Sequence, residues 1–334
     1  MKRILSIMLV LAVSGFVMAS PGTKTVKVFI LAGQSNMVGH GKVEMGRNPE
    51  WAKDAKAIPR EIKGGVGCLR SLATDPGTAK TYGKFLGADG KWAERDDVLI
   101  DATADAKRKK GKLSVGYGAG IWFGPELGFG WAVGDYLDYP VLIIKTSWGG
   151  KDLAVDFRPP SSGDTPLKKD REAGAYYRKM MELIKESLAN YEKDFPELKG
   201  YKAEIAGFGW HQGWNDGCSK EATAEYEKNM ANFINDVRKD LGVKDLPFVI
   251  ANTGQNGMKT AGTFADLCEA QMNIGDPAKH PEFKETVASV DTRPFLMPEE
   301  RAISGMGYHW NHSGDSHYLV GNAMGEAMMK LMSK

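Results

Sequence analysis

The stretch VKVFILAGQSNM, residues 26–37, decides the fold of this chain. Its first six residues form a short, largely apolar run, which is typical of a strand buried on both faces of a parallel sheet. The run ends just before Gly33, and a serine, Ser35, follows two residues later. Several hydrolase folds present a nucleophilic serine at a turn directly after a strand. Ser35 is therefore a candidate nucleophile, which needs a general base and an oxyanion site elsewhere.

More short apolar runs follow along the chain, and segments of helical periodicity lie between them. We predict strands over residues 26–31, 141–145, 204–210, 248–252 and 286–291. Apolar spacing predicts helices over 177–191 and 226–241, one that begins near Pro125, and a last one over about 316–331. This alternation predicts an α/β fold with three layers, α/β/α, around a central, mainly parallel five-stranded sheet.

The segments that follow the predicted strands are polar and contain glycine. They read GQSN at 33–36, TSWGGK at 146–151, HQGWND at 211–216, NTGQN at 252–256 and GYHWN at 307–311. Ligands of such sheets bind beyond the carboxyl ends of the strands, so these segments should converge on one site. Together they supply a nucleophile, backbone N–H donors, amide side chains and a histidine, which are the parts of an acyl-transfer site.

The first residues of the chain predict a signal peptide. Lys2 and Arg3 precede an apolar stretch at 4–17, and Val17-Met18-Ala19 fits a small-residue cleavage site. The apolar stretch is short for a membrane span, so we expect no stable membrane insertion. Residues 1–19 would be removed, and the protein would be exported to the periplasm or the outside of the cell.

Residues 20–334 predict a single domain with one irregular part. Residues 40–120 are rich in Gly, Lys and Asp and show no strong periodicity, which predicts a loop-rich insertion. The insertion either shapes the substrate cleft or is solvated without contacting substrate.

Composition argues against several classes of partner. The chain has 44 basic and 42 acidic residues, and its short basic run at 107–110 lacks the aromatic and basic surroundings of a nucleic-acid site, which predicts a solvated loop. Three cysteines, Cys68, Cys218 and Cys268, allow at most one disulfide within the chain. The sequence leaves their pairing and the oligomeric state open.

Metal and cofactor motifs are also missing from the sequence. The cluster of His309, His312, Asp315 and His317 fits no standard metal-binding helix motif, and no cysteine spacing resembles a zinc site. The glycines after the first predicted strand match neither a phosphate-binding loop nor a dinucleotide fingerprint. We therefore expect neither a metal nor a cofactor.

The segments after the strands resemble the SGNH hydrolases, in particular the sialate O-acetylesterase-like branch, carbohydrate esterase family 6, which includes acetylxylan esterases. The blocks that carry the resemblance are GQSNM at 33–37, GPE at 124–126, WGG at 148–150 and WHQG at 210–213. The resemblance runs from about residue 26 to 329 and is least clear over 40–120. The third loop departs from the branch, because Trp214 stands where Glu is usual. The resemblance implies the SGNH-hydrolase (flavodoxin-like) fold.

The resemblance implies roles for individual residues. Ser35 would attack an acetyl carbonyl, and His309 would be the general base. The backbone N–H of Ser35, that of Gly149 or Gly150 and the side chain of Gln212 would form the oxyanion hole. Further candidates for substrate contact are Gln34, Asn36, Trp148, His211 and Trp214. The alternative role of the tryptophans is packing around the loops, and that of His211 is to satisfy a buried hydrogen bond.

The third member of a catalytic triad is not in its usual place. Many SGNH enzymes carry Asp three residues before the catalytic histidine, and this chain has Met306 there. Asp216 is the first candidate for the acid, with Glu269, Glu299 and Asp315 as others. A Ser–His dyad is the alternative, because an orienting acid is not always indispensable.

The resemblance and the residues together predict an exported serine esterase that acts without a cofactor. It would remove O-acetyl groups from an acetylated polysaccharide or a sialic-acid-type sugar through an acetyl-enzyme intermediate. One alternative is an SGNH lipase or thioesterase for longer acyl esters, which would need an apolar channel where these loops are polar. Another is a carbohydrate-binding protein with a lapsed site, which Met306 favours.

Overall fold

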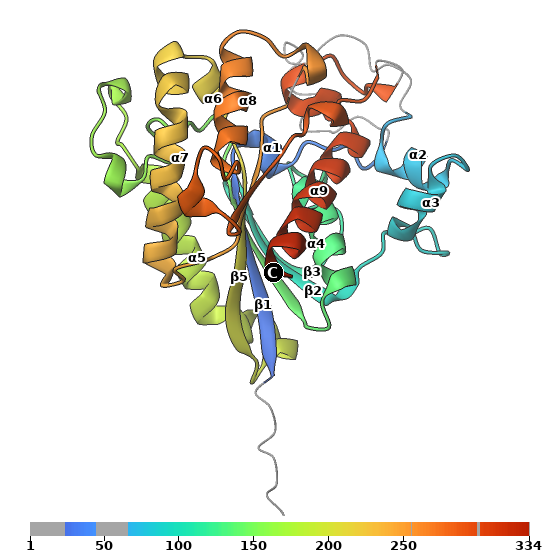
Figure 1. Cartoon of the computed structure of the whole chain (residues 1–334). Coiled ribbons are helices and arrows are strands. Elements are labelled where there is room, and N and C mark those ends of the chain that lie inside the picture. Colours follow the sequence, from blue (N-terminus) through green and yellow to red (C-terminus); the bar gives the residue numbers. More distant parts are fainter. Residues whose placement is uncertain (1–23, 45–65, 255, 299–300, 334) are drawn as a thin grey trace, which may run out of the picture.

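A computed structural model describes residues 24–44, 66–254, 256–298 and 301–333 of the chain (Figure 1). Its centre is a seven-stranded sheet in the order β3-β2-β4-β1-β5-β6-β7. The strands are β1 (Thr25–Gly33), β2 (Arg95–Ala104), β3 (Lys107–Leu113), β4 (Val141–Ser147), β5 (Lys202–His211), β6 (Phe248–Ala251) and β7 (Val287–Val290). Neighbouring strands are parallel except β2 and β3. The predicted α/β fold is confirmed, and β1, β4, β5, β6 and β7 are the five predicted strands.

The sheet is larger than predicted, because β2 and β3 extend it at one edge. The basic run at 107–110 lies in β3 and is not a loop. Its side chains form ion pairs, since Arg108 binds the buried carboxylate of Asp101 at 2.7 Å and Lys110 binds Asp194 at 2.5 Å. Lysines on an edge strand also discourage pairing with another chain.

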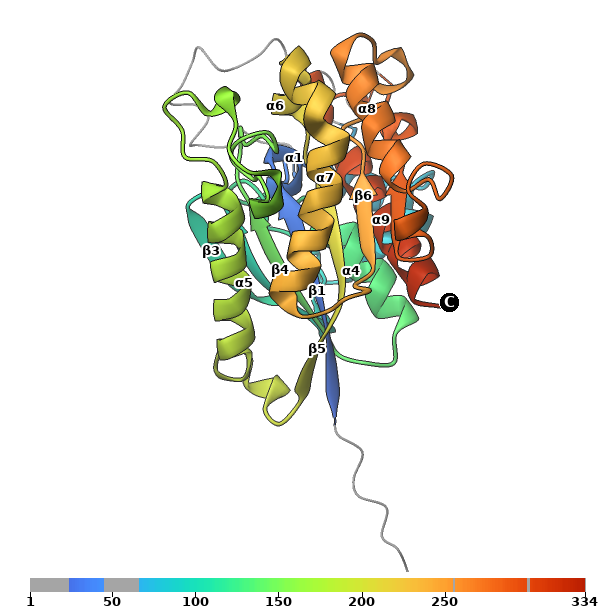
Figure 2. The same cartoon turned by 60° about the vertical axis from the view of Figure 1, so that its left-hand side comes forward.

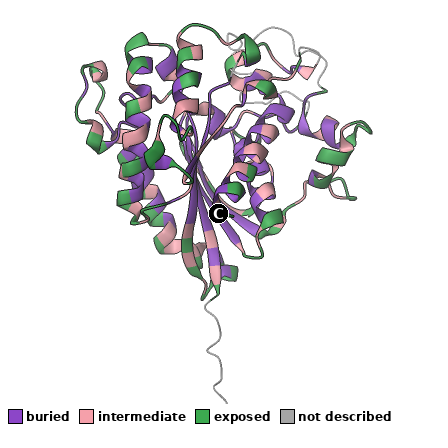
Figure 3. Cartoon of the chain, viewed as in Figure 1, coloured by how far each residue is buried: buried purple, intermediate pink, exposed green. Residues whose placement is uncertain are grey.

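Helices cover both faces of the sheet. Side chains of β1 point alternately to the two faces, so Val28 and Ile30 join one apolar core while Phe29 and Leu31 join the other. The first core includes α5 (Ala175–Asp194), α7 (Lys220–Leu241) and α8 (Thr263–Ile274), and the second includes α4 (Pro125–Tyr136) and α9 (Gly314–Met332). Figure 2 shows α5 and α7 in front of the sheet, and Figure 3 shows the buried strands between half-exposed helices.

Short helices fill the connections between these elements. They are α1 (Ser35–Val38), α2 (Leu69–Thr74), α3 (Ala79–Tyr82), η2 (Gly83–Phe85), η3 (Pro160–Ser162), η4 (Pro166–Lys168), η5 (Pro196–Leu198), α6 (Trp214–Gly217), η6 (Gly257–Lys259), η7 (Pro281–Phe283), η8 (Arg293–Phe295) and η10 (Gly307–His312). The carboxyl ends of the parallel strands point toward α1 and α6 (Figure 1). The predicted site segments therefore lie at one end of the sheet.

The predicted insertion is more regular than expected in its described part. It contains α2, α3, β2 and β3, and β2 pairs with β4. The predicted signal peptide at 1–19 and residues 45–65 lie outside the described residues. Across the described helices, none combines the length and the apolar character needed to cross a membrane. Cys68, Cys218 and Cys268, which are all described, are free thiols.

Candidate active site

Ser35 is the first residue of α1 and follows β1 after a sharp turn. The turn requires glycine at position 33, because a Cβ there would lie 2.1 Å from the carbonyl oxygen of His211 on β5. The first N–H groups of a helix have no acceptor within the helix. The Ser35 hydroxyl thus lies beside free backbone donors, and its residue is only half-buried. This arrangement suits a nucleophile, because the oxyanion of the tetrahedral intermediate needs hydrogen bonds.

His309 lies in η10, whose backbone is strained. Trp310, Asn311 and His312, the next three residues, all have positive φ angles of 52–58°. Left-handed conformations cost of order 1–3 kcal/mol for such residues and are held in place by surrounding structure. Here the fully buried Trp310 ring anchors the segment, and the carbonyl of Asn311 accepts hydrogen bonds from Ile303 and Ser304. The strained turn fixes where the His309 ring lies.

A hydrogen bond joins the serine segment to the histidine segment. Asn36 Nδ2 donates to the carbonyl oxygen of Tyr308 at 3.0 Å. Asn36 follows Ser35 directly, and Tyr308 directly precedes His309. The structure therefore brings the predicted nucleophile and the predicted base into neighbouring loops, although they lie 274 positions apart in the sequence (309 minus 35).

His309, the predicted base, is neutral at ordinary pH. Burial lowers the pKa of its imidazole to about 4. Its Nδ1 atom is buried and accepts or donates no hydrogen bond within the described part of the chain. No described carboxylate therefore orients this ring through Nδ1.

Asp216 is fully buried, and its hydrogen bonds lead away from His309. The carboxylate accepts bonds from the backbone N–H groups of Leu153 and Ala154 at 3.0 and 2.9 Å and from Gln212 Nε2 at 2.6 Å. Burial, followed by the charge of Asp152, raises the pKa of Asp216 to about 7. The observed contacts give Asp216 a structural place, in which it ties the loop after β5 to the segment after β4.

The other candidate acids also lie elsewhere. Asp315 forms an ion pair with Arg301 at 2.9 Å, and Glu269 is exposed on α8. Glu299 lies outside the described residues. None of the candidate acids in the described part of the chain therefore forms a hydrogen bond with Nδ1 of His309.

Two of the predicted oxyanion donors already have acceptors within the protein. Gln212 Nε2 donates to Asp216, to the carbonyl of Lys151 at 2.9 Å and to Gln34 Oε1 at 3.2 Å. The Gly149 N–H donates to Asp105 Oδ1 at 2.7 Å. The N–H of Gly150, by contrast, takes part in none of the hydrogen bonds of the described chain. The backbone donors of Ser35 and Gly150 are thus the ones left for an oxyanion.

Most of the residues predicted to contact substrate are buried. Gln34 joins two loops, because its Oε1 accepts from the Gly213 N–H at 2.9 Å. His211 Nδ1 forms a 3.1 Å hydrogen bond with the Ala251 carbonyl, and burial lowers its pKa to about 4. Trp148 packs against Tyr176 at 5.3 Å between ring centroids. These side chains, like buried Asn36, support the loops, which was the alternative role stated for Trp148 and His211.

Trp214 is the exception among those candidates. Its half-buried ring stacks on Phe264 at 4.5 Å and lies 5.3 Å from the ring of Tyr308. Tyr308 is 38% exposed, and its ring lies 4.6 Å from that of His309. Trp214 and Tyr308 thus form an accessible aromatic surface beside the base.

Two features of the site escaped the sequence reasoning. His40 stacks on His309 with ring centroids 3.8 Å apart and ring planes 11° apart. Lys145 on β4 forms a fully buried ion pair with Glu126 at 2.7 Å and also donates to the Val38 carbonyl at 2.8 Å, at the end of α1. The GPE block at 124–126 pointed to Glu126, one member of the pair. Nothing in the sequence around position 40 marked His40 as part of the site.

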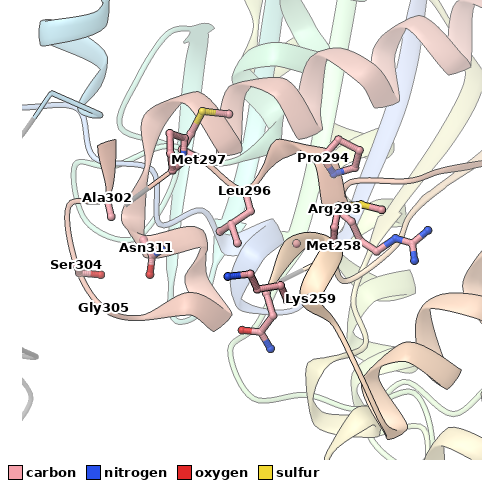
Figure 4. A pocket seen from close by; sticks show the side chains of 13 residues that line it. Met258, Lys259, Arg293, Pro294, Leu296, Met297, Ala302, Ser304, Gly305 and Asn311 are labelled. Atoms are coloured by element: carbon pink, nitrogen blue, oxygen red, sulfur yellow. The ribbon is translucent and has the colours of Figure 1, made fainter. Parts of the chain in front are cut away.

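A separate pocket of about 650 Å³ lies next to the histidine segment (Figure 4). Ser304 and Asn311 line one side, and Met258, Leu296 and Met297 contribute apolar surface. Neither Ser35 nor His309 lines this pocket. It is therefore a hollow beside the candidate site and not the place of the chemistry.

The family model and the curated relative that match this chain are both described as carbohydrate esterases. A family model described as "Carbohydrate esterase, sialic acid-specific acetylesterase" matches residues 25–330. The "Probable carbohydrate esterase At4g34215" of Arabidopsis thaliana is 26% identical over 251 residues, which are 74% of this chain and 75% of that protein. The X-ray structure of the same Arabidopsis protein matches with a TM-score of 0.56 and 18% identity over 92% of this chain and 98% of that one.

A carbohydrate acetylesterase from Xanthomonas citri, XAC1771, matches with a TM-score of 0.49 and 16% identity over 90% of this chain and 55% of that one. The Arabidopsis structure confirms the three-layer fold, and the family model covers nearly the whole described chain.

Proposed function

Because this chain belongs to the carbohydrate esterase family of sialic acid-specific acetylesterases and is thus a carboxylic ester hydrolase, we propose that it removes O-acetyl groups from a carbohydrate. Ser35 is the nucleophile and His309 the general base. The observation that carries this assignment is the 3.0 Å hydrogen bond from Asn36 to Tyr308, which holds the serine and histidine segments together.

The reaction proceeds in two acyl transfers. His309 takes the hydroxyl proton as Ser35 Oγ attacks the acetyl carbonyl carbon, and the oxyanion is held by the N–H groups of Ser35 and Gly150. His309 then returns the proton to the departing sugar oxygen, which leaves an acetyl-enzyme. Water, deprotonated by His309, attacks that ester, and acetate leaves as Ser35 regains its proton.

The sugar partner is supported by the accessible aromatic surface of Trp214 and Tyr308. An aromatic face beside the nucleophile suits the apolar C–H face of a sugar ring, and Tyr308 adds a hydroxyl group. Export is proposed as well, from the basic, apolar and small residues of positions 1–19.

The test measures acetate release by protein that lacks residues 1–19, with 4-nitrophenyl acetate, 4-nitrophenyl octanoate, acetylated xylan and O-acetylated sialic acid as substrates. We expect turnover of acetyl esters, and loss of at least about 10⁴-fold of kcat in Ser35→Ala. Ser333→Ala, a change of an exposed serine at the chain end, is the matched control. Mass spectrometry of quenched reactions should find one acetyl group on Ser35.

The same assay separates the alternatives. A preference for octanoate would indicate a lipase or thioesterase. Polysaccharide binding without turnover of any ester would indicate a lapsed site. Wild-type rates in Ser35→Ala would remove Ser35 as the nucleophile.

A further inference from the structure

Three histidines gather beside the candidate nucleophile. One ligand atom from each of His40, His309 and His312 lies within 4.8 Å of the other two. His40 comes from the loop after α1, and the other two come from η10. We call these three residues the histidine cluster. The fold assembles it from two distant segments, so no motif in the sequence announces it.

Two nitrogen atoms of the cluster lack the hydrogen bonds that buried polar atoms usually have. The Nδ1 atoms of His40 and His309 are buried, and the described residues offer them no hydrogen-bond partner. A buried polar atom without a partner destabilises the folded chain. A bound cation would give such nitrogens a partner.

His312 is oriented in the manner of a metal ligand. Its Nδ1 shares a 2.6 Å hydrogen bond with Ser304 Oγ, which fixes the orientation of the ring. Metal-binding histidines usually hold their second ring nitrogen in such a bond, because it directs the other nitrogen at the ion.

From this geometry we propose that the histidine cluster binds a divalent transition-metal ion of the zinc type, and that the bound ion switches the esterase off. Imidazole nitrogen is a preferred ligand of Zn²⁺, Co²⁺ and Cu²⁺. Three protein ligands leave a fourth position for water, as in open zinc sites. The ligand atoms must draw closer than they now lie, since bonds of about 2.0–2.1 Å require a smaller triangle.

Metal binding and catalysis use the same ring in two different positions. Imidazole binds a metal in the plane of its ring, whereas the rings of His40 and His309 are nearly parallel and stacked 3.8 Å apart. An ion bound to both rings therefore requires one of them to turn out of the stack. With the ion on Nδ1 of His309, the remaining ring proton lies on the other nitrogen, which can then no longer accept the proton of Ser35. This inhibitory half of the proposal rests on the proposed function.

A positive charge near the histidine cluster lowers the affinity that we expect for a metal ion. The positive charge of Lys42 acts on His312, and its ammonium lies 5.0 Å from the centroid of the Trp122 ring, which packs at 5.3 Å against His312. This charge opposes a dication. We therefore expect binding weaker than at a structural zinc site, and tighter binding when the charge is removed.

Binding is tested without reference to activity. Tag-free Ser35→Ala protein is titrated with ZnCl₂ by calorimetry and with CoCl₂ by visible absorption. We expect one ion per chain, at least about tenfold weaker binding when His40→Phe is added, and tighter binding with Lys42→Met. The control is His280→Phe, a histidine held by Glu227 and Glu282 away from the cluster. Unchanged affinity in His40→Phe, or equal loss in His280→Phe, would overturn the site.

A second measurement covers the case in which His40→Phe does not fold. Nitrogen-15 NMR of the ring nitrogens in the parent protein should show Zn²⁺ shifting three histidines and leaving His280 unmoved. Shifts confined to His280, or spread over all rings, would contradict the cluster.

The switch is tested on the active protein. Zn²⁺ should inhibit 4-nitrophenyl acetate hydrolysis reversibly, and activity should return when a chelator is added. With the rates of each protein expressed as fractions of its own metal-free rate, the inhibition constant of His40→Phe should be at least about tenfold higher than that of the parent protein. Binding without inhibition would overturn the switch and leave the site. A chain without esterase activity would refute the proposed function, while the titration would still decide the metal site.

Discussion

Asn36 donates its side-chain N–H to the carbonyl oxygen of Tyr308 at 3.0 Å, so the residue after the proposed nucleophile is bonded to the residue before the proposed base. No hydrogen bond from a described carboxylate reaches His309 Nδ1. Among the described residues, the position of the His309 ring therefore depends on backbone anchoring and on the stacked ring of His40.

Replacing Asn36 by Leu, which is close to it in size, should lower kcat by about 10- to 100-fold, because small displacements of a catalytic group have effects of this size. The free energy of unfolding should fall by only about 1–3 kcal/mol. Acetate release and urea unfolding measure the two effects. Asn232→Leu, which removes a 2.9 Å bond to Ser162 far from the site, is the control. Equal activity in both variants would contradict the anchoring role.

The acid limit of activity should lie unusually low. A general base acts only when it is unprotonated, and burial lowers the pKa of His309 from 6.5 to about 4. Activity should therefore persist as the pH falls below 6.5 and decline only near pH 4. The measurement is kcat/KM for 4-nitrophenyl acetate across this range. An acid limb near the ordinary histidine value would show that His309 is solvated or paired with an acid during catalysis.

Asp216→Asn distinguishes a structural carboxylate from a catalytic one. The amide oxygen can still accept the backbone N–H bonds from Leu153 and Ala154, but the amide nitrogen would face the Gln212 Nε2 donor, so we expect a loss of about 1–3 kcal/mol in stability. The acid limb of kcat/KM should stay in place. An acid that orients His309 would instead cost about 10⁴-fold in kcat with the fold intact. Asp266→Asn, an exposed change on α8, is the control.

The strands that the sequence predicts are those whose own residues are apolar. β1, β4 and β5 need no partner to be recognised, since buried parallel strands are apolar on both faces. β3 reads instead as a charge run, and β2 mixes Asp with apolar residues. β2 becomes a strand by pairing with β4, and β3 pairs with β2 in turn. The charges of β3 are held by distant residues, since Arg108 binds Glu186 and Lys110 binds Asp194, both on α5.

The site could be predicted only as a set of segments. Ser35 is located by a predicted strand that is followed by a glycine and polar residues. His309 is located by the resemblance to the family. Burial is a property of the packed chain, so nothing local distinguished the buried His211 from the accessible Trp214. The stack of His40 on His309 likewise joins positions 269 residues apart (309 minus 40), which no spacing rule reaches.

Trp214→Ala should weaken sugar binding without touching the chemistry. A lost stacking contact of about 1 kcal/mol corresponds to about a fivefold rise in KM for a polysaccharide ester. The kcat/KM for 4-nitrophenyl acetate should not change, because that ester has no sugar. Trp92→Ala removes another half-buried tryptophan, which packs on Arg70, and is the matched control. Equal losses on both substrates would place Trp214 in the support of the loops.

The buried ion pair of Lys145 with Glu126 should be the most sensitive support of the nucleophile. Lys145 also donates to the carbonyl of Val38, so the pair holds the end of α1, and burial lowers the pKa of the lysine. Glu126→Gln leaves a buried ammonium without its counter-charge, which should cost about 3–5 kcal/mol in urea unfolding. Adding Lys145→Met removes that charge and should recover part of the stability, whereas Asp164→Asn in the exposed pair with Lys168 should leave the stability nearly unchanged. Activity should not recover with stability in the double variant, because the hydrogen bond from residue 145 on β4 to the end of α1 is lost. Full recovery of both activity and stability would show that the pair does not position Ser35.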